Sequence, residues 1–330
     1  PKGNVITIGG NGKAGFENGD FQSTTQFSSP SGIAIWRDWQ WWPYPNPNDI
    51  DSFLYKNGGG KLVLFVADTG NHQIRKLNIL LDEQSRVERK VLDVKVECFS
   101  GCASVPRPGY ADGNSKEARF DSPRGIVVSD EGEIFVADTN NHLIRKIDRF
   151  GFTETIAGST KTAEINDKGY ALEGCPHPCL AGVQGHEDGN ALDAKFTFPN
   201  DVAIASREKL LFITEKHHVR QLNLKFQSVT TIAGSSGENE RDGYGSDASF
   251  NEPEGIAISM DGDLFISDSV SCRLRRGQYN AKAVPLSSCE DTLATIFRPP
   301  SCSSYNDPVD KYGLKITSKE GNMNYNYQHR

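Results

Sequence analysis

Residues 109–158 read GYADGNSKEARFDSPRGIVVSDEGEIFVADTNNHLIRKIDRFGFTETIAG. Residues 185–234 repeat this pattern as GHEDGNALDAKFTFPNDVAIASREKLLFITEKHHVRQLNLKFQSVTTIAG, and residues 241–276 repeat it as RDGYGSDASFNEPEGIAISMDGDLFISDSVSCRLRR. A first copy is divided between residues 16–35, FENGDFQSTTQFSSPSGIAI, and residues 61–79, KLVLFVADTGNHQIRKLNI. Self-similarity over a few tens of residues indicates a repeat architecture.

Each copy contains short apolar runs bounded by turn residues, which in the fullest copy are GIVVS, EIFVAD, HLIRKID and TETIAG. Alternation of apolar and polar residues, with many β-branched and aromatic side chains, predicts strands. Asp130, Glu131 and Gly132 separate the first two runs and are typical of a hairpin turn. Four strands joined by hairpins make an antiparallel sheet of the size of one propeller blade. We therefore predict an all-β fold, a β-propeller of four-stranded antiparallel blades.

Two motifs recur from copy to copy. The first is DTGNHQIR at residues 68–75, DTNNHLIR at 138–145, the shortened EKHHVR at 215–220 and the divergent DSVSCRLR at 268–275. The second, Gly-x4-Ala-x-Phe-x2-Pro, precedes three of these and is partly kept in the first copy. This pattern resembles the NHL-repeat family of β-propellers, of the extracellular type, named for the Asn-His-Leu that stands here at residues 141–143. The resemblance implies the fold and leaves the function open, since propellers host enzymes, receptors and scaffolds.

The repeats predict a propeller over residues 1–280 with four clear blades. Residues 281–330 leave the repeat, and we expect a cysteine-containing extension there, either a linker or a degenerate blade suggested by residues 312–325. Residues 5–10, VITIGG, match the blade-ending TIAG strand. Because propellers often close by letting one terminus complete the other's blade, we expect a strand at residues 5–8 to finish a blade begun near the C-terminus. The alternative is that the chain comes from a longer one and leaves the ring incomplete.

Composition excludes several classes of function. The formal net charge is -7 and no stretch is a run of Lys or Arg, which argues against nucleic-acid binding. No apolar stretch in this segment approaches the length of a membrane span. The sequence contains no Gly-x-Ser-x-Gly, His-Glu-x-x-His or phosphate-loop motif, so we expect a non-catalytic protein without a cofactor.

Seven cysteines bear on the compartment. Cys98 and Cys102 form the close pair CFSGC, and Cys175 and Cys179 form the close pair CPHPC, each in what the sequence indicates is an irregular insertion. We interpret them as disulfide staples and expect an extracellular or cell-surface location. The rival interpretation of CPHPC is a metal site with His177 as third ligand. A third disulfide is expected between Cys289 and Cys302, which leaves Cys272 as the odd thiol.

The repeated polar residues allow two interpretations. His72, His142 and His217 occupy equivalent places in three blades. Imidazole is a metal ligand, so these three could ring the channel of a metal-dependent lyase or hydrolase, as the resemblance to peptidylglycine amidating lyases implies. We favour a structural role, because residues shared by all blades recur with the hairpin itself. For the same reason we expect the repeated Asp/Glu and Arg residues of the first motif to link neighbouring blades.

Function is therefore expected where the repeat is interrupted. The candidate binding residues are the aromatic side chains of one loop within the first blade: Trp36, Trp39, Trp41, Trp42 and Tyr44. Trp and Tyr dominate binding hot spots, and a loop between strands lies at a propeller face. The alternative is that these rings fold back and cover that face. Residues 80–109 and 159–184 are further insertions. We predict a binding or structural module that contacts other proteins, copies of itself or glycans within a larger secreted or surface assembly.

Overall fold

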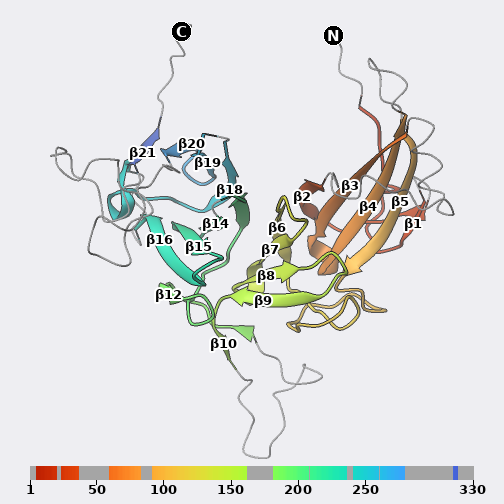
Figure 1. Ribbon diagram of the computed structural model, residues 1–330, viewed down its shortest axis with the longest axis horizontal. Coiled ribbons are helices and arrows are strands. Elements are labelled where there is room, and N and C mark those ends of the chain that lie inside the picture. The colour runs from red at the N-terminus through yellow and green to blue at the C-terminus, as the bar shows by residue number, and fades with distance from the viewer. Residues whose placement is uncertain are drawn as a thin grey trace, which may run out of the picture.

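The fold is known from a computed structural model that describes residues 5–20, 24–36, 59–82, 91–161, 181–207, 209–235, 241–259, 261–278 and 315–318. Its main elements are four antiparallel sheets that follow one another along an arc (Figure 1). The sheet built from the N-terminal copy and the sheet built from the last copy stand at the two ends of this arc (Figure 1). The predicted all-β propeller architecture is confirmed. Within the described residues, no helix has the length and apolarity that a membrane-spanning helix needs.

Each sheet contains four strands that neighbour one another in chain order. The first has β2 (Pro30–Trp36), β3 (Gly59–Asp68), β4 (Gln73–Asp82) and β5 (Val91–Ser100). The second has β6 (Pro123–Val128), β7 (Ile134–Asp138), β8 (Leu143–Ile147) and β9 (Thr153–Ala157). The third has β13 (Asp201–Ala205), β14 (Leu210–Glu215), β15 (His218–Asn223) and β16 (Ser228–Gly234). The fourth has β18 (Pro253–Ile258), β19 (Asp263–Asp268), β20 (Arg273–Gln278) and β21 (Lys315–Ser318).

A lead-in segment precedes the innermost strand of each sheet: residues 15–20 and 24–29 in the first, 109–122 in the second, 185–200 in the third and 241–252 in the fourth. Short strands in three of these segments, β1 (Gly19–Asp20), β12 (Gly189–Asn190) and β17 (Gly243–Tyr244), pair with the outermost strand of the same sheet. In the second sheet, a single bridge between Gly113 and Thr153 takes this place. The remaining elements are the strand pair β10 (Thr160–Lys161) and β11 (Ala181–Gly182) and the 3-10 helices η1 (Thr69–Asn71), η2 (Thr139–Asn141) and η3 (Gly245–Asp247).

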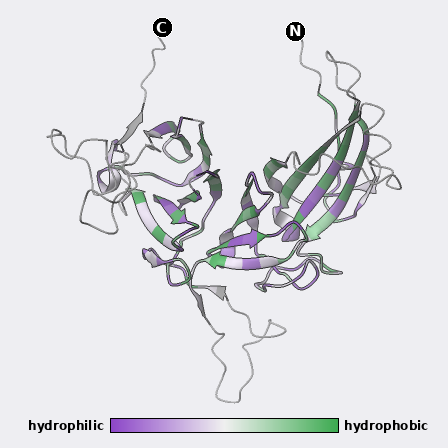
Figure 2. Cartoon of the chain, in the orientation of Figure 1, coloured by the Kyte–Doolittle hydropathy of each residue, from purple (hydrophilic) through white to green (hydrophobic). Residues whose placement is uncertain are grey.

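The core lies between consecutive sheets because alternate residues of a strand face opposite sides. In β7, Ile134 and Val136 pack toward the first sheet, whereas Phe135 and Ala137 pack toward the third. Hydrophobic residues accordingly follow the strands of all four sheets (Figure 2). The innermost strands approach so closely that Gly125 N donates to Asn200 O at 2.9 Å. A Cβ at Gly125 would collide with the backbone of the third sheet, so glycine is required there.

Several local expectations need correction. Residues 80–109 are not an irregular insertion, because β4 continues to Asp82 and Val91–Ser100 is the outermost strand of the first sheet. Residues 5–8 form no strand; Ile8 packs against the outer apolar face of the first sheet. Within residues 312–325, the described Lys315–Ser318 is the outermost strand of the fourth sheet and pairs with β20, so this part does not begin a further blade. The division of the chain at residue 280 stays a prediction.

Candidate functional site

Each sheet buries one carboxylate–guanidinium pair that joins its second and third strands. The oxygen–nitrogen distances are 3.0 Å for Asp68–Arg75, 2.7 Å for Asp138–Arg145, 2.7 Å for Glu215–Arg220 and 3.0 Å for Asp268–Arg275. All eight side chains are excluded from solvent. The phenylalanine of the second motif lies over each guanidinium at 4.9–5.1 Å, so the two repeated motifs meet at one point in every blade.

The arginine of each pair also holds the lead-in segment. Arg145 donates to the carbonyl oxygens of Arg119 at 2.9 Å and Ala111 at 2.7 Å, and to Asp112 Oδ1 at 2.7 Å. Arg75, Arg220 and Arg275 make the corresponding bonds in their own blades. The pairs therefore fasten each lead-in segment to its own sheet. Our expectation that they link one blade to the next was wrong.

The shared histidines make that link instead. His72 Nδ1 accepts a hydrogen bond from Ser122 N at 3.0 Å, and His142 Nδ1 accepts one from Phe198 N at 3.1 Å. His217 donates from Nδ1 to Phe250 O at 3.2 Å. Each partner belongs to the lead-in segment of the following sheet. Burial lowers the pKa of His72 and of His142, which keeps both rings neutral and Nδ1 free to accept.

Trp36 is the described member of the aromatic loop. It ends β2, is half-buried, and packs against the core between the first two sheets. A Cβ at Gly132 would lie 2.8 Å from Trp36 Cζ2, so this ring covers the β6–β7 turn of the second sheet. Trp39, Trp41, Trp42 and Tyr44 lie outside the described residues. Trp36 itself follows the alternative interpretation, in which a ring folds back onto the propeller.

The first sheet is longer than the others at the end where this loop leaves it. Strands β3, β4 and β5 each contain 10 residues, against five or six for the strands of the second sheet. Gly59 pairs with Asp82 at this end, while Asp68 pairs with Gln73 at the other. Residues 37–58 and 83–90 therefore both connect strands at the same, extended end of the first blade. This end of β3–β5 extends past the second sheet (Figure 1). We call this extended end of β3–β5 the first-blade platform.

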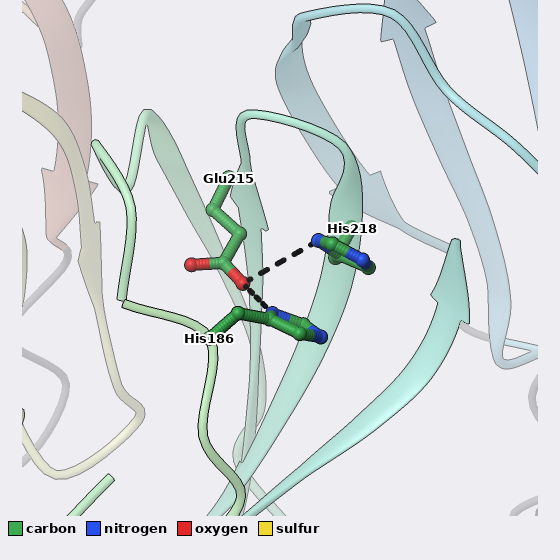
Figure 3. Close-up of side chains that lie close together, drawn as sticks. All are labelled: His186, Glu215 and His218. Atoms are coloured by element: carbon green, nitrogen blue, oxygen red, sulfur yellow. Dashed lines mark hydrogen bonds and ion pairs between the residues drawn. The ribbon is translucent and has the colours of Figure 1, made fainter. Parts of the chain in front are cut away.

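Three departures from the repeat meet in the third sheet (Figure 3). Glu215 replaces the aspartate of the other blades. His218 is the register partner of Glu215, whereas Leu143 is the register partner of Asp138 in the second blade. His186 stands in the lead-in segment at the position that Tyr110 has in the second blade. His186 Nδ1 lies 2.9 Å from Glu215 Oε1, and His218 Nδ1 lies 3.9 Å from the same oxygen. The two imidazole rings stack at 3.6 Å between centroids, with 18° between their planes.

The protonation states of this cluster follow from its surroundings. Burial, reinforced by the nearby His186, lowers the pKa of His218 to about 4, so this ring is neutral at pH 7. Burial also acts to raise the pKa of Glu215, but the hydrogen bond from His186 and the Arg220 charge outweigh it, and the pKa lies below its usual value. One ligand atom from each of the three side chains lies within 4.8 Å of the other two.

Metal ligation by the three shared histidines stays a prediction. Among the described residues, the one group of three His, Cys, Asp or Glu side chains close enough to share an ion is His186, Glu215 and His218. His72, His142 and His217 are not part of it, and the Nδ1 atom of each is engaged by a neighbouring blade. Sequence reasoning missed the cluster. An alignment of the blade sequences would have found it, because His186 aligns with Phe16 and Tyr110, which are aromatic residues.

The family model of the teneurin NHL domain matches residues 52–234, which is more than half of the chain. The chain belongs to the teneurin NHL domain family. NHL repeat-containing protein 2 of Bos taurus is 28% identical over 230 residues, covering 64% of this chain and 28% of that protein. Teneurin-1 of Homo sapiens is 25% identical over 228 residues, covering 65% of this chain and 8% of that protein. This NHL chain therefore spans about a quarter of the first relative and less than a tenth of the second.

Among solved structures, a nidogen/laminin complex is similar to this NHL chain with a TM-score of 0.38 and 13% identity, covering 77% of this chain and 62% of that one. A virginiamycin B lyase from Staphylococcus aureus is similar with a TM-score of 0.34 and 13% identity, covering 79% and 70%.

The cysteines of this NHL domain agree in part with expectation. Cys98 and Cys102 form a disulfide, although Cys98 lies in strand β5 and not in an irregular loop. Cys272 is exposed and free, as the cysteine count suggested. The four other cysteines, at residues 175, 179, 289 and 302, lie outside the described residues.

Proposed function

We propose that this teneurin-family NHL domain is a non-catalytic binding module whose first-blade platform makes protein–protein contacts within a larger extracellular assembly. The observation that carries the proposal is the use of the repeated polar residues. The Asp/Glu–Arg pairs are buried and bond to backbone and side-chain groups of their own blade, and the shared histidines bond to the next blade. Partner recognition is thus left to the parts in which blades differ.

The first-blade platform is the largest such difference. Residues 37–58 and 83–90 connect strands at this end, and three of the four tryptophans of the chain lie in residues 37–58, directly after Trp36. Trp36, at the base of this loop, is held against the core by the second blade and anchors one end of the loop. Aromatic side chains displayed from a rigid scaffold give large contact area at low entropic cost. They suit a protein surface, another copy of this chain or a glycan.

An extracellular setting is supported by the Cys98–Cys102 disulfide, since such bonds persist in oxidising compartments. The match to teneurins is compatible with an extracellular setting. NHL repeat-containing protein 2 also matches, and its name indicates no compartment.

The test compares the wild-type domain with the triple variant W39A/W41A/W42A. Both are screened against arrays of extracellular proteins and glycans, and self-association is followed by sedimentation velocity. We expect the wild-type domain to bind a protein ligand or itself, and the variant to lose that binding while it keeps the wild-type circular dichroism spectrum. Equal binding by the variant, or binding that follows substitutions on other blades, would refute the role of the platform. Turnover that depends on His72, His142 and His217 would favour the enzyme alternative.

A further inference from the structure

We propose that His186, Glu215 and His218 form a binding site for a divalent transition metal, best suited to Zn²⁺. The site lies in the third blade and is independent of the first-blade platform, so neither proposal depends on the other. Two imidazoles and one carboxylate are a ligand set that Zn²⁺ uses in proteins, with water completing the shell. His186 supplies the open side, since its side chain is 38% exposed while Glu215 is fully buried.

The separations of the ligand atoms are close to those that zinc requires. Zinc–nitrogen bonds of about 2.0 Å and zinc–oxygen bonds of about 2.1 Å place tetrahedral neighbours roughly 3.4 Å apart. The two imidazole nitrogens now lie 2.9 and 3.9 Å from Glu215 Oε1, one slightly short and one slightly long. Both imidazoles lie on the same side of the carboxylate (Figure 3). Because imidazole lone pairs lie in the ring plane and the two rings are stacked, the partly exposed His186 ring must rotate out of the stack before both nitrogens point at one ion.

The neighbouring charges allow a cation despite Arg220. Arg220 NH1 bonds to Glu215 Oε1 at 2.7 Å, but its NH2 bonds to Asp188 Oδ1 at 2.8 Å. Arg220 NH1 also lies 3.5 Å from His186 Nδ1, so a bound cation would share the pocket with this guanidinium, whose charge Glu215 and Asp188 together offset. Glu215 Oε2 is fixed separately by Thr197 N at 2.8 Å, so the carboxylate is already oriented before a metal binds.

The second and third blades connect the hairpin to the lead-in segment in different ways. In the second blade, Asn141 Nδ2 bridges Asp138 Oδ2 at 2.9 Å and Gly109 O at 2.8 Å, which ties the hairpin to the lead-in segment. The third-blade hairpin is two residues shorter and lacks this asparagine. His186 comes from the lead-in segment, while Glu215 and His218 come from the hairpin. Thr197 Oγ1 donates to Gly185 O at 2.9 Å and His186 Nδ1 lies 2.9 Å from Glu215 Oε1, so a metal bound by these three side chains would reinforce an existing connection, which gives the site a structural role.

The experiment adds Zn²⁺ alone to the metal-stripped protein and measures affinity and stoichiometry by calorimetry, with the melting temperature as a second readout. Variants H186Y and H218L introduce the residues that the second blade carries at these positions. Variant H177Q is the matched control, since it removes the histidine of the CPHPC motif. We expect one equivalent of zinc to bind wild-type protein and H177Q, with a rise in melting temperature, and an affinity lower by more than about 100-fold in H186Y and H218L.

No binding to the wild-type protein would overturn the site, as would binding that H186Y retains or that H177Q abolishes. If H218L does not fold, H186Y decides alone, because its position is partly exposed and tolerates tyrosine in the second blade. Nitrogen chemical shifts of the two imidazoles on zinc addition distinguish direct ligation from binding elsewhere.

Discussion

Substitution of Asp138 by alanine tests the structural role of the repeated ion pairs. Asp138 Oδ2 accepts from Arg145 at 2.7 Å and from Asn141 at 2.9 Å, and its Oδ1 accepts from Asp121 N at 2.8 Å. The variant leaves three donors without this acceptor: the buried side chains of Arg145 and Asn141, and the backbone N–H of Asp121. The Arg145 side chain also carries a full positive charge. Removal of one partner of a buried pair typically costs about 3–5 kcal/mol of unfolding free energy. We expect D138A to lose an amount in this range.

Asp112 provides the matched control because it bonds to the same guanidinium at 2.7 Å but is 40% exposed. Water can replace its carboxylate, so we expect D112A to lose about 1 kcal/mol. Urea unfolding at pH 7.5, followed by circular dichroism, measures both changes. Equal losses for the two variants, or a loss below about 1 kcal/mol for D138A, would refute the claim that burial of the pair makes it structural.

Three further results are expected. G125A should lose about 3 kcal/mol in urea unfolding, since its Cβ collides with the third-sheet backbone, whereas G255A meets mainly a movable serine hydroxyl and should lose less than half as much. The unfolded protein protonates His218 near pH 6.5 but the folded protein only near pH 4, so unfolding free energy should fall by about 3 kcal/mol as pH drops through this window. In H218L this part of the pH dependence should be absent; an unchanged profile would contradict the buried neutral ring. Replacing Cys98 and Cys102 by serine should cost about 2 kcal/mol, given the short loop they close; no change in urea midpoint would show that the disulfide adds no stability.

The blade itself could be predicted from the sequence because its signals are local. Period-two runs such as EIFVAD predict a strand within a single copy, and repetition confirms the unit. Even the two motifs point to a shared role, since Phe120 and Arg145 recur together and lie in contact. Repetition does not show whether a repeated side chain contacts its own blade or the next one. Arg145 serves its own blade and His142 serves the next one, and only the path of the lead-in segment decides this.

Elements that depart from the repeat were harder to predict. Residues 91–100 alternate as VLDVKVECFS but lack the TIAG ending, so their place as the outermost strand depends on pairing with β4. Lys315–Ser318 is separated from β20 by a long segment, and such non-local pairing leaves no local signal. His186 and His218 meet because the lead-in segment crosses the sheet, although 31 intervening residues separate them in the sequence.

The repeated polar residues build the propeller, and we propose that the first-blade platform binds the partner. The most direct measurement is affinity per folded molecule for the ligand identified with wild-type protein, in D138A and in W39A/W41A/W42A side by side. We expect D138A to unfold more readily while its folded fraction binds with wild-type affinity, and the tryptophan variant to stay folded and lose binding. Folded D138A that has lost its affinity, together with a tryptophan variant that keeps it, would contradict this division between scaffold residues and binding residues.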